Sequence, residues 1–146
     1  MKKVYLATPV GGPTDFEIRD NADGAEEILR ELGFDVYCPW QMKIHNAWDY
    51  TNQEWGLMVF TADLQELQKC DLVVMLSYGR VSTCGTAWEQ GFAYAQDKKI
   101  IVVEMNDNIQ SLMVSNGCYA RVKGLEGLKN YDFEEMPRRR TDTEQK

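Results

Sequence analysis

Two unbroken apolar runs constrain the fold of this chain most strongly. The segments Leu72–Leu76 and Ile100–Val103 are short, contain β-branched residues and have no polar interruption. Alternating apolar and polar residues are typical of a strand with one solvated face, whereas an unbroken run is typical of a strand buried on both faces. Such strands occur in parallel sheets that carry helices on both sides. The two runs therefore predict the centre of a parallel α/β sheet.

The rest of the chain alternates between strand-like and helix-like segments. Further strand patterns are predicted at residues 3–8, 34–38 and 119–123. Helices are predicted at residues 22–32, 51–69, 85–97, 109–114 and after residue 124, and Asp20 or Asn21 is expected to cap the first one. This alternation predicts an α/β fold with five parallel strands, in one domain over residues 1–137. Residues 138–146 form a basic tail, for which we expect a flexible, solvated terminus.

The charge of the chain argues against several classes of partner. The 23 Asp and Glu residues outnumber the 16 Lys and Arg residues and give a net charge of −7. We expect no nucleic-acid polymer as a partner, because binding to a phosphate backbone depends on clustered cations. No apolar run approaches the roughly 18 residues of a membrane span, and no signal-peptide pattern is visible. We therefore expect a cytoplasmic protein that binds no membrane.

Neither a metal nor a nucleotide cofactor is expected from the motifs. The Gly11-Gly12 pair is not followed by the Lys-Ser/Thr of a phosphate loop, and no Gly-x-Gly-x-x-Gly is present. The cysteines form no Cys-x-x-Cys pair, and only one histidine could join them as a ligand. We expect reduced thiols in or near the core at Cys38, Cys70, Cys84 and Cys118.

The segment after the central strand carries the first candidate for chemistry. Gly85 and Gly91 leave room for a ligand or for a neighbouring backbone. Glu89 falls in the first or second turn of the helix predicted there, where the helix dipole stabilises a carboxylate by about 0.3–1 kcal/mol. On position alone, Glu89 either complements the start of this helix or serves as a nucleophile at the carboxyl edge of the sheet.

Two further residues come into question around Glu89. Asp63 lies on the helix at 51–69, and it is either a structural charge or a second carboxyl group that approaches Glu89. Paired carboxyl groups in different environments can divide the nucleophile and acid roles. Tyr5, in the first strand, is either a core aromatic or a phenol that orients a carboxylate.

The order of these motifs resembles the nucleoside 2-deoxyribosyltransferase family over residues 3–137. The motifs that carry the resemblance are Lys3-Val4-Tyr5-Leu6-Ala7, Ala62-Asp63-Leu64, Cys70-Asp71-Leu72-Val73-Val74, Gly85-Thr86-Ala87-Trp88-Glu89-Gln90-Gly91, Ser111-Leu112-Met113 and Lys129-Asn130-Tyr131-Asp132-Phe133. The resemblance implies a flavodoxin-like three-layer fold and cleavage of the N-glycosidic bond of 2′-deoxynucleosides.

The roles that this resemblance implies fall on three residues. Glu89 would attack the anomeric carbon and hold the deoxyribosyl group covalently, Asp63 would help to protonate the departing base, and Tyr5 would orient Glu89. The second acceptor decides the product, because another base gives transfer and water gives hydrolysis.

Two positions depart from the transferase pattern. Thr83 stands where nucleoside-specific members usually carry Asp, and Ser111 stands where they usually carry Asn. Both resemble the related 2′-deoxynucleoside 5′-phosphate N-hydrolases, and hydroxyls and helix-start amides, including those near Gly85 and Thr86, can donate to a phosphate. The phosphate-binding arginine of those hydrolases has no obvious counterpart, with Arg19 the nearest candidate. The interpretation favours a 5′-monophosphate N-glycosidase, and a base-exchanging transferase is the alternative.

The resemblance also concerns assembly and base recognition. It implies a homo-oligomer, a dimer or larger, with shared active sites in which Ser111 and Met113 act across a subunit interface. The aromatic loop with Trp40, His45 and Trp48 is expected either to cover the base or to pack a small satellite core. A non-catalytic nucleotide-binding module on the same fold is the remote alternative, and it has no use for a convergence of Tyr5 and two acidic residues.

Overall fold

The computed structural model describes residues 1–9, 15–79 and 84–139. Its centre is a parallel five-stranded sheet with the strand order β2-β1-β3-β4-β5. The strands are β1 (Lys3–Ala7), β2 (Asp35–Tyr37), β3 (Leu72–Ser77), β4 (Lys99–Glu104) and β5 (Ala120–Lys123). The two apolar runs form β3 and most of β4, so the prediction of a parallel α/β fold is confirmed. The strand order reverses between β1 and β3, which is where ligands bind in such sheets.

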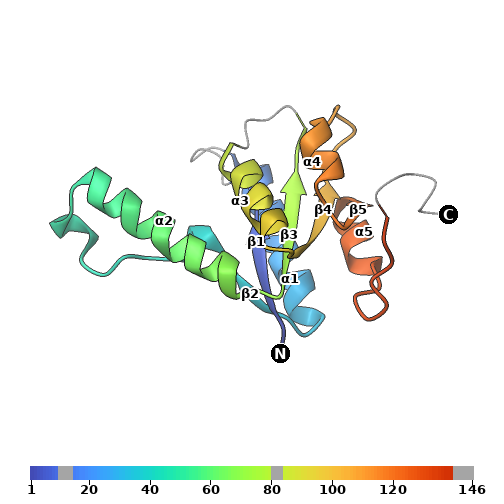
Figure 1. Cartoon of the computed structure of the whole chain (residues 1–146), viewed down its shortest axis with the longest axis horizontal. Coiled ribbons are helices and arrows are strands. Elements are labelled where there is room, and N and C mark those ends of the chain that lie inside the picture. The colour runs from blue at the N-terminus through green and yellow to red at the C-terminus, as the bar shows by residue number, and fades with distance from the viewer. Residues whose placement is uncertain (10–14, 80–83, 140–146) are drawn as a thin grey trace.

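Helices cover both faces of this sheet (Figure 1). They are α1 (Phe16–Glu31), α2 (Asn52–Lys69), α3 (Cys84–Ala95), α4 (Leu112–Asn116) and α5 (Gly124–Asn130). Within the described part of the chain, no helix is both long enough and apolar enough to cross a membrane.

Alternation along β1 divides the core into two clusters. Val4 and Leu6 point to the face covered by α1 and α5, whereas Tyr5 and Ala7 point to the opposite face. On that second face the buried side chains include Leu67 of α2 and Ala93 of α3. The side chain of Tyr5 is therefore directed toward the layer formed by α2 and α3.

The first helix begins earlier than its sequence pattern predicted. α1 starts at Phe16, so Asp20 and Asn21 lie inside the helix and cap nothing. Ile18, which lies before the predicted range of 22–32, extends the buried stripe by one turn. The end of the helix was placed correctly, because Gly33 adopts a φ of 94° that favours glycine.

The helix α2 is only partly supported by the rest of the chain. A capping box between Thr51 and Glu54 fixes its start. Its first half projects away from the sheet (Figure 1), and the predicted apolar stripe is buried only at Leu67. Leu57 is 66% exposed and Phe60 is 46% exposed. The predicted helix is thus present, but no other part of the described chain covers most of its apolar face.

Candidate active site

The buried pair of Tyr5 and Glu89 forms the centre of the candidate site. Tyr5 is fully buried in β1, and Glu89 lies in the second turn of α3, which packs against the same face of the sheet. The Tyr5 hydroxyl donates a short hydrogen bond to Oε2 of Glu89. A strand and a helix that are 84 residues apart in sequence thus hold one carboxyl group in a fixed orientation.

The surroundings of Glu89 bring its pKa close to neutrality. The pKa of Glu89 is raised to about 7, mainly by burial, and the hydrogen bond from Tyr5 lowers it while the nearby Asp63 carboxylate raises it. The helix dipole favours the ionised carboxylate, but burial outweighs it at this position. The pKa of Tyr5 is also raised, mainly by burial, so its phenol stays protonated and remains a donor.

A second tyrosine holds the second carboxyl group. The hydroxyl of Tyr37, at the end of β2, donates to Oδ1 of Asp63 on α2 at 2.9 Å. Burial raises the pKa of Asp63, the Glu66 carboxylate raises it too, and the bond from Tyr37 lowers it. A raised pKa favours the protonated form that a general acid needs.

These residues form one group on one face of the sheet. The rings of Tyr5 and Tyr37 lie 5.4 Å apart, and the charge on Asp63 acts on the pKa of both Tyr5 and Glu89. Among the described residues, none of the ion pairs includes Glu89 or Asp63. The three residues singled out from the sequence therefore lie together. The partner of Asp63, Tyr37, was not expected.

A cavity of about 210 Å³ lies where β3, α3 and the loop before α4 meet. Ser111 lines it together with the first turn of α3, and a Cβ added at Gly85 would meet only open space. Thr86 is buried, whereas Met113 is 82% exposed. Thr83, for which a substrate contact was expected, lies outside the described residues. The described residues that line the cavity are Ser77, Gly79, Cys84, Ala87, Gln110, Ser111 and Val114.

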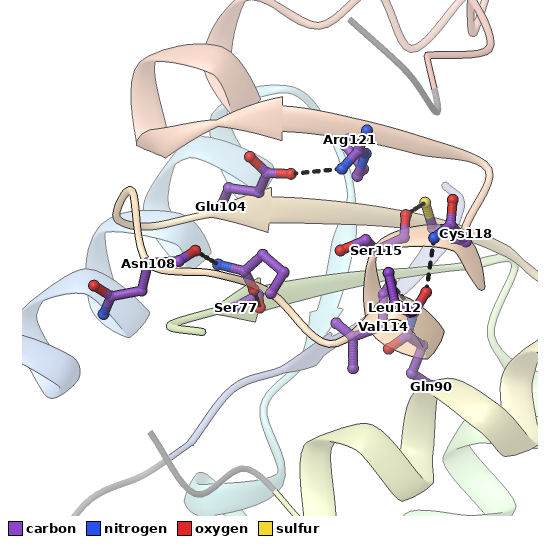
Figure 2. Close-up of polar contacts among 11 residues, drawn as sticks. Ser77, Gln90, Glu104, Asn108, Leu112, Val114, Ser115, Cys118 and Arg121 are labelled. Carbon is purple, nitrogen blue, oxygen red and sulfur yellow. Dashed lines mark hydrogen bonds and ion pairs between the residues drawn. The ribbon is translucent and has the colours of Figure 1, made fainter. Parts of the chain in front are cut away.

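Side-chain amides fix the loop that carries Ser111. The Ser77 hydroxyl at the end of β3 donates to Oε1 of Gln110, and the Asn106 amide donates to the Tyr78 carbonyl at 3.1 Å. Gln90 of α3 donates to the carbonyls of Val114 and Gly117, each at 2.8 Å. Figure 2 shows Gln90 directed at α4 from the neighbouring helix. These contacts place Ser111 relative to the start of α3.

A Cβ at Gly117 would lie 2.7 Å from the Met113 carbonyl oxygen, so the turn after α4 requires glycine.

The sequence signal for the Gln90 contact is a glutamine inside an otherwise apolar helix face, which is unusual unless its amide has partners.

The aromatic loop is more exposed than the satellite-core interpretation requires. Trp40 packs partly against the core and lines a second cavity, of about 300 Å³, with Arg19 and Asp23 of α1. His45 is exposed, and Trp48 is 96% exposed. Trp48 therefore packs no satellite core within the described chain, and a role in covering a base stays a prediction.

Two other expectations need comment. Three cysteines are buried as expected, but Cys84 is exposed because it opens α3 at the edge of the sheet. Of the expected basic tail, Arg139 lies against β5, where its carbonyl accepts from the backbone N–H of Arg121 at 2.8 Å, and the Arg138 guanidinium lies over the Tyr119 ring. Residues 140–146 lie outside the described part of the chain.

The fold and the site define a class of protein. A parallel α/β sheet brings together a buried glutamate with a pKa near 7, an oriented aspartate and two phenols, which is a composition suited to acid–base or covalent glycosyl chemistry. The chain matches the nucleoside 2-deoxyribosyltransferase family over residues 4–135. It belongs to that family. It is an enzyme that cleaves or transfers at the N-glycosidic bond of nucleosides or nucleotides, which overturns the non-catalytic alternative.

Solved structures agree with this assignment. A 2-deoxyribosyltransferase from the psychrotolerant bacterium Bacillus psychrosaccharolyticus is 28% identical, with 94% of this chain and 97% of that chain covered and a TM-score of 0.82. A CMP N-glycosidase from Clostridium botulinum shares the fold at 19% identity, with 88% of this chain and 96% of that chain covered and a TM-score of 0.61. A comparison with curated proteins finds no significant match.

Proposed function

We propose that this enzyme hydrolyses the N-glycosidic bond of 2′-deoxynucleoside 5′-monophosphates through a covalent intermediate on Glu89. The observation that carries the proposal is the hydrogen bond from Tyr5 to Glu89 beside Asp63. It leaves one oxygen of the Glu89 carboxylate accepting from a phenol and the other, Oε1, available for attack.

The proposed reaction has two displacements. Oε1 of Glu89 forms a bond to C1′ of the sugar while the bond from C1′ to the base nitrogen breaks, and the electron pair leaves with the base. Asp63 supplies the proton that the departing base takes up. Water then attacks C1′, the ester bond to Glu89 breaks, and the water proton returns to the carboxylate of Asp63. Dividing one displacement into two lowers the barrier of each.

The lining of the cavity beside Ser111 supports the proposal that the substrate carries a phosphate. None of its described lining residues is acidic, although the chain as a whole has a net charge of −7. The Ser111 hydroxyl and the backbone amides that open α3 are donors suited to a phosphate. At position 83 the chain has threonine where nucleoside-specific members usually carry a carboxylate, which removes a source of repulsion.

A base-exchanging 2-deoxyribosyltransferase is the second candidate. It is favoured by the 28% identity to a 2-deoxyribosyltransferase over 94% of this chain. It is also favoured because no cation is among the described residues that line the cavity beside Ser111. The chemistry at Glu89 is the same for both candidates, and they differ in the acceptor and in the 5′ group.

A substrate panel separates the two candidates. The protein is incubated with 2′-deoxynucleosides and with their 5′-monophosphates, each with and without an added acceptor base, and the products are resolved by chromatography. Free base from the monophosphate without an acceptor is the expected result. Base exchange on the unphosphorylated nucleosides would establish the transferase instead, and no consumption of any substrate would refute both.

The unsupported half of α2 favours assembly of this enzyme into a homo-oligomer. Phe60 of α2, Trp88 of α3 and Phe92 form a row of ring contacts with centroids 5.4 and 5.6 Å apart. Phe60 and Trp88 remain about half exposed in the single chain, and such apolar surface is typical of a protein contact. We place a second copy of the chain on this surface, in keeping with an active site shared between subunits.

A further inference from the structure

Tyr37 and Tyr5 occupy equivalent positions on neighbouring strands. Their Cα atoms are register partners in the parallel pair of β1 and β2, so both side chains point to the same face of the sheet. Each phenol donates to one carboxyl group: Tyr5 to Glu89 and Tyr37 to Asp63. The second bond, at 2.9 Å, has no part in the chemistry described so far.

We propose that Tyr37 is a positioning residue for the acid step, holding Oδ1 of Asp63 so that Oδ2 carries the proton given to the departing base. The inference rests on the proposed function. In this role Tyr37 does not contact the substrate, because Tyr37 acts through Asp63.

The strength of the Tyr37 bond changes during the reaction that we propose. Before the base departs, Asp63 is a neutral acid and its Oδ1 accepts an ordinary hydrogen bond. As the Oδ2 proton moves to the base nitrogen and the bond to C1′ breaks, Asp63 becomes a carboxylate and the bond from Tyr37 becomes charge-assisted. An interaction that is stronger in the transition state than in the ground state accelerates the step.

The other charged and titratable groups around Asp63 come from four elements, α2, β1, α3 and β2. Glu66, one turn along α2, raises the pKa of Asp63, and Lys3 of β1 pairs with Glu66 at 2.5 Å. Glu89 of α3 feels the charge on Asp63, as do the phenols of Tyr5 and Tyr37. Burial and the Glu66 carboxylate raise the pKa of Asp63, and the hydrogen bond from the Tyr37 hydroxyl lowers it. Its removal should therefore shift the titration in one direction.

The first test measures the Asp63 carboxyl itself. Tyr37→Phe keeps the ring that packs beside Tyr5 and removes only the donor. Carbon-13 NMR titration of aspartate-labelled protein, with the Asp63 signal assigned by Asp63→Asn, should show a higher pKa for Asp63 in the variant. The sign follows because the lost bond stabilised the charged form. An unchanged or lower pKa would overturn the inference, and this readout does not need turnover.

The second test compares leaving groups. Tyr37→Phe should lower kcat by about tenfold on substrates with a poorly leaving base, change it little on substrates with an activated base, and leave KM unchanged. A purely structural defect would lower kcat equally on both kinds of substrate. An equal loss would therefore refute the positioning role. Tyr131→Phe is a matched control, because that hydroxyl donates to the Pro137 carbonyl at 2.8 Å and Tyr131 packs in the core cluster on the opposite face of the sheet from Tyr5.

A double variant identifies the residue through which Tyr37 acts. Tyr37→Phe combined with Asp63→Asn should be no slower than Asp63→Asn alone. Additive losses would contradict action through Asp63. If the wild-type protein consumes no substrate, the proposed function fails, while the NMR titration still decides whether Tyr37 controls the Asp63 carboxyl.

Discussion

The bond between Tyr5 and Glu89 predicts a shift in the pH profile of the enzyme. The Tyr5 hydroxyl stabilises the charged form of Glu89, so Tyr5→Phe should raise the pKa of Glu89 above about 7. A nucleophile must be ionised, and the acidic limb of kcat/KM against pH should therefore move to higher pH. The loss at pH 7 should be about 10- to 100-fold, the range expected for a hydrogen bond to a charged group. A limb that stays in place or moves to lower pH would count against this role.

The raised pKa of Glu89 predicts that this carboxyl group lowers the free energy of unfolding at neutral and higher pH. Its pKa is about 7 in the folded protein against 4.5 as the reference value, so the folded state binds more protons than the unfolded state between these pH values. Stability is therefore lost as the pH rises from 4.5 through 7, by up to about 3.5 kcal/mol at roughly 1.4 kcal/mol per pKa unit.

Replacing this carboxyl by an amide should remove the cost. Glu89→Gln should raise the free energy of unfolding at pH 8 and have little effect at pH 4.5, measured by urea titration at both pH values. The change that Glu89→Gln makes to the free energy of unfolding is compared at the two pH values. If the variant gains less stability over the wild type at pH 8 than at pH 4.5, burial does not destabilise the charged carboxyl group.

At the residue scale, the sequence singled out both acids and Tyr5, the partner of Glu89, but not Tyr37, the partner of Asp63. Glu89 and Asp63 stood out because they lie on helices next to apolar segments and match a family pattern. The role of Tyr37 depends on the register between β1 and β2, and the position of Gln90 depends on how α3 meets α4. Both are relations between distant segments, which local spacing does not specify.

At the element scale, a side chain of α3 holds the end of α4. Gln90 is buried and donates to two carbonyls, those of Val114 and Gly117, and Figure 2 shows it directed at α4. Gln90→Ala should leave both carbonyls without this donor and cost about 1–3 kcal/mol of stability. Because α4 follows Ser111 directly, the variant should also raise KM for a monophosphate substrate. Thermal denaturation measures the loss of stability, and steady-state kinetics measure KM. An unchanged KM would show that α4 does not influence substrate binding at the cavity beside Ser111.

The strands and α-helices of the described residues were predictable in kind, since apolar runs and helical spacing report burial directly. Two details were not. The early start of α1 depends on Ile18 meeting the core, and the exposure of Leu57 depends on how far α2 extends past the sheet. Periodicity identifies an apolar face but does not say what covers it.

At the scale of the whole molecule, the exposed face of α2 predicts self-association. Leu57→Glu places a charge on that face, and it should lower the molar mass of the assembly in size-exclusion chromatography with light scattering. Gln65→Glu, on an exposed position of the same helix, adds an equal charge and should leave the mass unchanged. A monomeric wild-type protein, or an assembly that survives Leu57→Glu intact, would contradict the placement of a second copy.

The central claim is that Glu89 forms the bond to the sugar. The most direct measurement compares base release from 2′-deoxynucleoside 5′-monophosphates by the wild-type protein and by Glu89→Ala, with circular dichroism to show that both are folded. The account predicts turnover by the wild type and a loss of at least about 1,000-fold in the variant, since removal of a covalent nucleophile leaves only binding and acid assistance. A folded Glu89→Ala protein that releases base at the wild-type rate would contradict it.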